Sequence, residues 1–165
     1  VLEDDAVVSP GLHQCLEQIL ARFSSATAAW DILLLGYNTD SAVDLRLSPN
    51  MSFRGHFSLK NPSPEQIQEV LGRPEDCAAL RLNNAFGTCG YLISPAGARR
   101  LLKWCFPLRD EQFLVPSLKR VLVASSIDGL MNAIYPQLSA YCCVPPLALS
   151  SNRPDESTIC AGRPS

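Results

Sequence analysis

Two features that define large protein classes are missing from this sequence: a long apolar run and an excess of basic charge. Apolar runs such as residues 32–35 are far shorter than the roughly 20 residues that a membrane-spanning helix needs. The net charge is −2, with 14 Lys and Arg against 16 Asp and Glu. A dedicated nucleic-acid binder usually carries a basic excess. We therefore expect neither a membrane span in this chain nor a nucleic-acid partner.

Several catalytic and metal-binding signatures are also missing. No serine stands in a Gly-x-Ser-x-Gly setting, which argues against hydrolase chemistry of that type. No Gly-x-x-x-x-Gly-Lys-Ser/Thr loop is present, which excludes kinases and GTPases that depend on it. No cysteine pair has Cys-x-x-Cys spacing, so a zinc knuckle is not indicated.

Cysteine itself is abundant, with seven residues, an odd number. Most lie in apolar contexts, such as Tyr141-Cys142-Cys143-Val144, where cysteine behaves as a small hydrophobic residue. These contexts favour buried free thiols. One or two disulfides in a secretory compartment are the alternative.

The length and composition predict one packed domain. The chain has 165 residues, of which 47% are apolar and 18% charged, so it can bury a core and disorder is not expected. It begins with Val1 rather than Met, and we interpret it as a fragment or a trimmed domain. We assign residues 1–150 to the domain and the polar residues 151–165 to a C-terminal tail.

Apolar spacing and capping residues predict alternating strands and helices. Expected strands lie at residues 1–2 (the buried end of a strand), 31–36, 77–82, 86–93 and 138–144. Expected helices lie at residues 10–25, 63–72, 96–104, less regularly at 111–122, and in a short segment from 126. Residues 37–62 are predicted to form a long irregular loop. This alternation favours an α/β fold of three layers with a mostly parallel sheet.

An acidic triplet, Glu3-Asp4-Asp5, directly follows the apolar residues that open the chain. In open α/β sheets, ligands bind at the carboxyl ends of strands. Carboxylate oxygens there suit Mg²⁺ or Mn²⁺, which leave coordination positions open for phosphate oxygens. The other interpretation is a solvated turn with three surface acids.

A series of segments, taken together and in order, resembles glycosyltransferase family 25. The segments are Val1-Leu-Glu-Asp-Asp5, Trp30-Asp-Ile-Leu-Leu-Leu-Gly36, Gly87-Thr-Cys-Gly-Tyr-Leu-Ile-Ser-Pro-Ala-Gly-Ala98 with Leu101-Leu102, Ile127-Asp128, Tyr141 with Pro145-Pro146-Leu147, and Ser157-Thr-Ile159. That family includes bacterial lipooligosaccharide galactosyltransferases and the procollagen hydroxylysine galactosyltransferases. The resemblance covers residues 1 to about 159.

The resemblance implies a glycosyltransferase-A-like fold, a UDP-sugar donor (typically UDP-galactose), Mn²⁺ or Mg²⁺, and inversion at the anomeric carbon. By this analogy Glu3, Asp4 and Asp5 bind the donor with its cation. Glu3 and Asp5 fill the outer positions of the acid-x-acid motif and are the candidate metal ligands. Asp5 would contact the metal, and Glu3 or Asp4 would support the ribose or a metal-bound water.

Asp128 is the candidate catalytic base, because it matches the family's single Asp in this region. Direct inversion requires a carboxylate that accepts the proton of the attacking hydroxyl. The other interpretation of Asp128 is an acid in the first turn of a helix, stabilised by the helix dipole. Arg99-Arg100 is interpreted as a solvated helix face or, alternatively, as a contact to an anionic acceptor.

The family's nucleotide-binding first half would precede the acidic motif. We therefore expect this chain to be a carboxyl portion with little transfer activity of its own. A non-catalytic relic or interaction module is the alternative function. The sequence does not identify the acceptor, and two alternatives remain: a glycan or glycoprotein, and hydroxylysine. The compartment also stays open: the cytoplasmic side of a membrane for a bacterial protein, the endoplasmic reticulum or Golgi lumen for a eukaryotic one.

Overall fold

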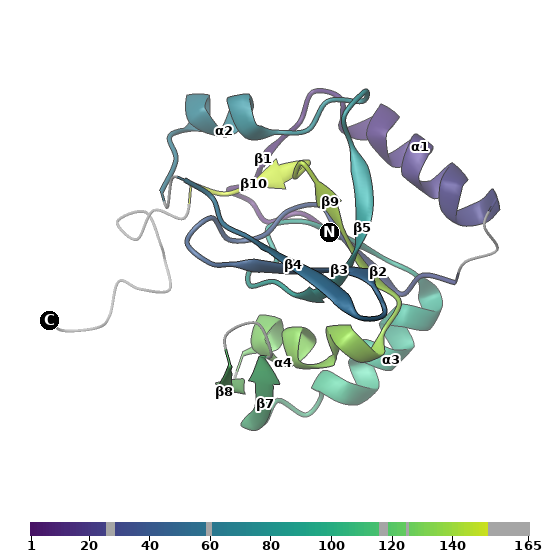
Figure 1. Cartoon of the computed structure of the whole chain (residues 1–165), viewed down its shortest axis with the longest axis vertical. Coiled ribbons are helices and arrows are strands. Elements are labelled where there is room, and N and C mark those ends of the chain that lie inside the picture. The colour runs from purple at the N-terminus through teal and green to yellow at the C-terminus, as the bar shows by residue number, and fades with distance from the viewer. Residues whose placement is uncertain (26–28, 59–60, 116–118, 125, 152–165) are drawn as a thin grey trace, which may run out of the picture.

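The centre of the structure, a computed structural model, is a six-stranded mixed sheet with the order β4-β3-β5-β9-β2-β6 (Figure 1). The model describes residues 1–25, 29–58, 61–115, 119–124 and 126–151. The strands of this sheet are β2 (Ile32–Leu34), β3 (Val43–Ser48), β4 (Met51–Gly55), β5 (Ala78–Asn84), β6 (Tyr91–Ile93) and β9 (Ala140–Val144). Two antiparallel pairs lie outside it: β1 (Val7–Val8) with β10 (Ala148–Leu149), and β7 (Glu111–Val115) with β8 (Arg120–Ala124).

The fold combines helices and strands, as an α/β fold was expected to do. The expectation of a mostly parallel sheet, however, is wrong. Within it, β2 pairs in parallel with β9, while the pairs β2–β6, β5–β9, β3–β5 and β3–β4 are antiparallel. The apolar run at residues 32–35 correctly predicted a strand that is buried on both faces. Burial on both faces does not determine the direction of the neighbouring strands, and the prediction of a parallel sheet failed at this step.

Successive residues of β2 enter two different cores, because side chains alternate along a strand. Ile32 and Leu34 pack with residues of α3 (Pro95–Cys105) and α4 (Ile127–Ile134). Leu33 packs on the opposite face with residues of α1 (Leu12–Ser25). Helices therefore cover both faces of the sheet, α1 on one and α3 with α4 on the other (Figure 1).

Three helices begin where their capping residues predicted. In α2 (Pro64–Val70) Ser63 forms a capping box with Gln66. Ser94 and Ser126 cap α3 and α4 through their side-chain oxygens, which accept hydrogen bonds from backbone N–H groups. The helices expected at 63–72, 96–104 and from 126 are thus confirmed, and the helix expected at 10–25 is present as α1, which begins at Leu12. A short 3₁₀ helix, η1 (Tyr135–Gln137), follows α4.

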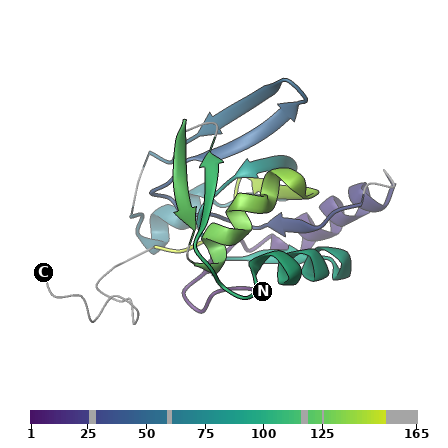
Figure 2. The ribbon, with the colours of Figure 1, turned by 90° about the horizontal axis from the view of Figure 1, so that it is seen from below.

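Two segments were assigned wrongly, and both form hairpins. Residues 37–62, expected as an irregular loop, contain the antiparallel pair β3–β4. Residues 111–122, expected as a helix, contribute to the pair β7–β8, which lies beside α4 (Figure 2). In β7 the buried Val115 follows the exposed Leu114, so the alternation is that of a strand with one covered face.

The start of the chain also differs from its prediction. Val1 and Leu2 are 68% and 48% exposed and do not form the end of a buried strand. Leu2 instead makes an isolated bridge with Gly90. On α3, Leu101 is buried, whereas Leu102 is 60% exposed.

The cysteines of the described residues are free thiols and buried, as their apolar contexts predicted. They are Cys15, Cys77, Cys89, Cys105, Cys142 and Cys143. Cys160 and most of the tail assigned to residues 151–165 lie outside the described residues, from 152 onward. Within the part that the structure describes, no helix combines the length and apolar character needed to cross a membrane.

Candidate active site

The acidic triplet is held against the glycine-containing segment that precedes β6. We call Glu3, Asp4 and Asp5 the acid turn. The backbone N–H of Glu3 donates to the carbonyl of Cys89 at 3.1 Å, and the N–H of Tyr91 donates to the carbonyl of Val1 at 3.0 Å. The residues before the acid turn thus pair with residues 89–91. Because of this pairing, the two most distinctive segments of the sequence lie side by side.

Two hydroxyl groups from distant parts of the chain orient the carboxylates of the acid turn. Thr88 Oγ1 donates to Glu3 Oε1 at 2.8 Å, and Ser150 Oγ donates to Asp5 Oδ2 at 2.5 Å. Thr88 precedes β6 and Ser150 directly follows β10. The three acids are exposed. Solvent and ligands can therefore reach carboxylates that are already oriented.

The backbone that carries Thr88 requires glycine at position 87. Gly87 has φ +87°, a conformation that L side chains rarely adopt, and a Cβ there would lie 2.0 Å from Asn38 Oδ1. The N–H of Asn38 donates to the carbonyl of Phe86 at 2.7 Å. The loop that follows β2 and the loop that carries Thr88 are therefore packed together and hold the threonine in place.

The buried residue Cys89 lies next to the acid turn, and the nearby carboxylates affect the pKa of its thiol. Its side chain is 2% exposed, and the thiol donates to the carbonyl of Ala148 at 3.6 Å. Burial raises the pKa of the Cys89 thiol to about 12, with further contributions from the carboxylates of Glu3 and Asp5. The raised pKa favours the neutral thiol at physiological pH.

The acid turn offers carboxylate oxygens that are not occupied by hydrogen bonds from the described part of the chain. Glu3 Oε2 and Asp5 Oδ1 accept no hydrogen bond from the described part of the chain. Carboxylate oxygens are the ligands that Mg²⁺ and Mn²⁺ prefer. No group of three or more His, Cys, Asp or Glu side chains in the described residues is arranged to hold a metal. A cation at this turn would therefore need further oxygen ligands from a bound molecule or from water.

Asp128 lies in the first turn of α4, half-buried. Ser126 Oγ donates to its carboxylate and accepts from the N–H of Gly129. The pKa of Tyr135 is raised chiefly by burial and next by the charge of Asp128, so the carboxylate lies near this buried hydroxyl. Among the described residues no hydrogen bond or ion pair joins Asp128 to the acid turn. The structure brings Glu3, Asp4 and Asp5 together and leaves the role of Asp128 as a prediction.

Sequence reasoning missed the partners of the acid turn. Thr88 stands inside the glycine-containing segment that the sequence singled out, so its neighbourhood was visible although its role was not. Ser150 follows an apolar stretch at the end of the assigned domain and carries no local signal of its contact with Asp5.

Comparison with known proteins supports one family. The model of "Glycosyltransferase family 25 (LPS biosynthesis protein)" matches residues 1–114 of the 165. No curated protein and no solved structure matches the chain. The matched region contains both the acid turn and the segment that carries Thr88, and it ends before Asp128. The resemblance deduced from the sequence is thereby confirmed, and the chain belongs to glycosyltransferase family 25.

Proposed function

We propose that this chain supplies the acid turn that holds the donor diphosphate and its cation in a metal-dependent glycosyltransferase, which moves galactose from UDP-galactose to an acceptor hydroxyl. One observation carries the proposal: the acid turn is fixed on residues 88–91, with Glu3 oriented by Thr88 and Asp5 oriented by Ser150. Such ordering argues against a non-catalytic relic, which needs no oriented, solvent-facing carboxylates.

In this proposal Glu3 and Asp5 hold Mn²⁺ or Mg²⁺ together with the donor diphosphate, and Asp4 supports the ribose or a bound water. When bound, the cation neutralises the charge that develops on the leaving diphosphate. Three neighbouring carboxylates repel one another until positive charge arrives. The hydrogen bonds from Thr88 and Ser150 limit the movement of two of them, so less ordering remains to be done when the donor binds.

The remaining features of the reaction follow from the family resemblance. Transfer with inversion is a single displacement, in which the acceptor oxygen attacks while a base removes its proton. We assign the base to Asp128, whose half-buried carboxylate is oriented by Ser126. A glycosyltransferase-A-like arrangement is supported by the helices on both faces of the sheet.

The test measures UDP affinity with and without MnCl₂ by calorimetry, in the wild-type chain, in Asp5→Asn and in a matched control, Asp76→Asn. Asp76 is an exposed acid outside the acid turn. We expect UDP binding to depend on Mn²⁺, and Asp5→Asn to weaken it by about tenfold or more, because a charged ligand is lost. Asp76→Asn should bind like the wild type. Equal metal-dependent affinity in Asp5→Asn and the wild type would remove Asp5 from the site and overturn the proposal.

A further inference from the structure

Three buried cysteine side chains from different parts of the chain meet in the core that α1 shares with the sheet. Cys15 belongs to α1, Cys77 directly precedes β5, and Cys143 belongs to β9. The side chain of Cys77 makes hydrogen bonds with the side chains of both other cysteines. We call these three residues the thiol cluster.

The thiol cluster is a set of neighbouring reduced thiols. All three cysteines are free in the structure. Within the residues that the structure describes, no three side chains of His, Cys, Asp or Glu are arranged to hold a metal ion. Oxidation is the chemistry that thiols in such a group undergo, because one of them can capture the oxidised form of another as a disulfide.

The hydrogen bonds give the three thiols different acidities. The pKa of the Cys77 thiol is lowered to about 7, chiefly by its hydrogen bond with Cys143 and further, against the effect of burial, by Cys15 and the charge of Arg22. The pKa of Cys143 is raised, chiefly by the same hydrogen bond, and burial raises the pKa of Cys15 to about 11. Near neutral pH, Cys77 is therefore the thiolate of the cluster, with two protonated neighbours. The thiolate, and not the thiol, is the nucleophile in cysteine chemistry.

Cys77 is also the member of the cluster that reaches the surface. Cys77 is 6% exposed, whereas Cys15 and Cys143 are both 0% exposed. It directly follows a turn at residues 74–76, which contributes to the lining of a cavity of about 340 Å³. A small oxidant can therefore reach Cys77 from solvent, while the other two sulfur atoms stay covered.

The sheet register indicates which neighbour suits a disulfide with Cys77. Ala79 of β5 is the register partner of Cys143, so Cys77 stands diagonally to Cys143. The Cα atoms of diagonal neighbours lie about 7–8 Å apart, whereas most disulfides join Cα atoms about 4.4–6.8 Å apart. Cys15 lies on α1, which packs on this face of the sheet, and no strand register fixes its distance from Cys77 (Figure 1). Cys15 is therefore the partner that the fold favours.

We propose that Cys77 is an oxidation site, and that a peroxide converts the thiols of Cys77 and Cys15 into a disulfide that links α1 to the start of β5. The bond joins segments that are far apart in the sequence, and such a link restricts the unfolded chain. The inference does not rest on the function proposed above.

The reaction has two steps, and hydrogen peroxide is the oxidant. In the first, the Cys77 thiolate attacks one peroxide oxygen, an S–O bond forms, the O–O bond breaks, and the leaving hydroxide takes up a proton to become water. In the second, the Cys15 sulfur attacks the sulfur of the Cys77 sulfenic acid. The S–S bond forms, the S–O bond breaks, and the hydroxide leaves as water with the proton of the Cys15 thiol. Two thiols are thus oxidised to one disulfide, and one peroxide is reduced to two waters.

The experiment treats the reduced wild-type chain with increasing amounts of hydrogen peroxide. Remaining thiols are blocked with iodoacetamide after unfolding, and disulfides are mapped by mass spectrometry of proteolytic peptides. We expect the peptides that contain Cys15 and Cys77 to become joined, with the loss of one hydrogen atom from each. Because this map is obtained from the wild type, it stays decisive if a cysteine variant unfolds.

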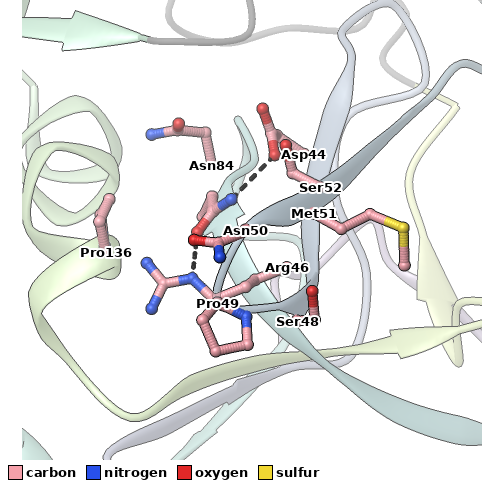
Figure 3. Close-up of a pocket in the computed structure, with 10 residues that line it drawn as sticks. Asp44, Arg46, Ser48, Pro49, Asn50, Met51, Ser52, Asn84 and Pro136 are labelled. Atoms are coloured by element: carbon pink, nitrogen blue, oxygen red, sulfur yellow. Dashed lines mark hydrogen bonds between the residues drawn. The ribbon is translucent and has the colours of Figure 1, made fainter.

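Met51 provides an internal measure of the peroxide dose. It lies on the β3–β4 hairpin, where it lines a different cavity (Figure 3), and it is 54% exposed. Its thioether is oxidised to the sulfoxide without forming an anion. Since a thiolate is the stronger nucleophile, the disulfide between Cys15 and Cys77 should form at peroxide amounts that leave Met51 unoxidised.

Three variants separate the two steps. In Cys15→Ser, oxidation of Cys77 should stop at the sulfenic acid, which dimedone captures. In Cys77→Ser, Cys15 should stay reduced at the same amount of peroxide. Cys105→Ser removes a buried thiol from the core on the opposite face of the sheet, and this matched control should form the disulfide like the wild type.

The inference is wrong if the wild type joins Cys77 to Cys143 or to any cysteine other than Cys15. It is also wrong if Cys77 is still a thiol when Met51 has become the sulfoxide, or if Cys15 is oxidised as readily in Cys77→Ser as in the wild type.

Discussion

Thr88 Oγ1 donates a hydrogen bond of 2.8 Å to Glu3 Oε1, although the two residues stand 85 positions apart in the chain. This bond connects the acid turn to the segment that contains Gly87 and Tyr91. Both belong to the region matched by the family model. If the acid turn binds the donor as proposed, Thr88 is a positioning residue for Glu3 and not a catalytic residue.

Removing the Thr88 hydroxyl should therefore weaken donor binding without unfolding the chain. We expect Thr88→Val to lower Mn²⁺-dependent UDP affinity by roughly tenfold, the usual value of a hydrogen bond to a charged group. Thr88→Ser keeps the hydroxyl and should restore affinity, which a purely structural role of the methyl group would not produce. Calorimetry with UDP and MnCl₂ gives both values. Unchanged affinity in Thr88→Val would show that this hydrogen bond does not matter for the donor.

Asp128→Asn separates the two interpretations of Asp128. If the carboxylate is the base, sugar transfer should slow by about 10²–10⁴-fold while donor affinity stays nearly unchanged. If it only stabilises the start of α4, the variant should lose about 1 kcal/mol of stability or less and keep its turnover. Turnover and melting temperature are measured on one preparation with detectable sugar transfer. A lowered melting temperature with full turnover per folded molecule would exclude Asp128 as the base.

The neighbouring Arg99 and Arg100 should behave differently, because only Arg100 has an acidic partner within the described residues. Arg100 Nη1 lies 2.7 Å from Asp31 Oδ2, and that carboxylate also accepts from the N–H of Ser139 at 2.9 Å. Asp31 is 3% exposed, so loss of Arg100 leaves a buried charge with less compensation.

We expect Arg100→Gln to reduce the free energy of unfolding by roughly 1–2 kcal/mol, a moderate value because the arginine is itself partly exposed. Arg99→Gln, on the solvent side of α3, should change it by less than about 0.5 kcal/mol. Urea unfolding of the two variants provides the comparison. Equal destabilisation by both variants would contradict a specific role of the Arg100–Asp31 pair.

Alkaline pH should destabilise the chain through three of its buried thiols, Cys15, Cys89 and Cys142. Burial raises the pKa of Cys15 to about 11 and the pKa values of Cys89 and Cys142 to about 12, from an ordinary value of 9.0. Between about pH 9 and these values the unfolded chain binds fewer protons than the folded chain, so the free energy of unfolding falls as pH rises. Below about pH 9 the contribution of these thiols is fully present.

Urea unfolding at about pH 8 and about pH 10, under reducing conditions, measures this loss. The variant Cys89→Ala lacks one of the titrating thiols, and its stability should fall less between the two pH values. An equal fall in Cys89→Ala and the wild type would contradict the assignment of this titration to Cys89.

Features that depend on neighbouring residues were predictable from the amino-acid sequence. Ser63, Ser94 and Ser126 marked the starts of three helices, because an N-cap acts within one turn of the chain. The apolar run at residues 32–35 predicted the buried strand β2, and the acidic triplet with the glycine-containing segment identified the family.

Features that depend on pairing between distant segments emerge only in the folded chain. The direction of β5 and β6, the hairpins β3–β4 and β7–β8, and the exposure of Leu102 follow from which surfaces meet, and short windows of sequence do not specify this. The contacts of Thr88 with Glu3 and of Ser150 with Asp5 join residues 85 and 145 positions apart. Hydrogen bonds over such separations form only when the folded chain brings these segments together, so the acid turn was visible in the sequence and its oriented geometry was not.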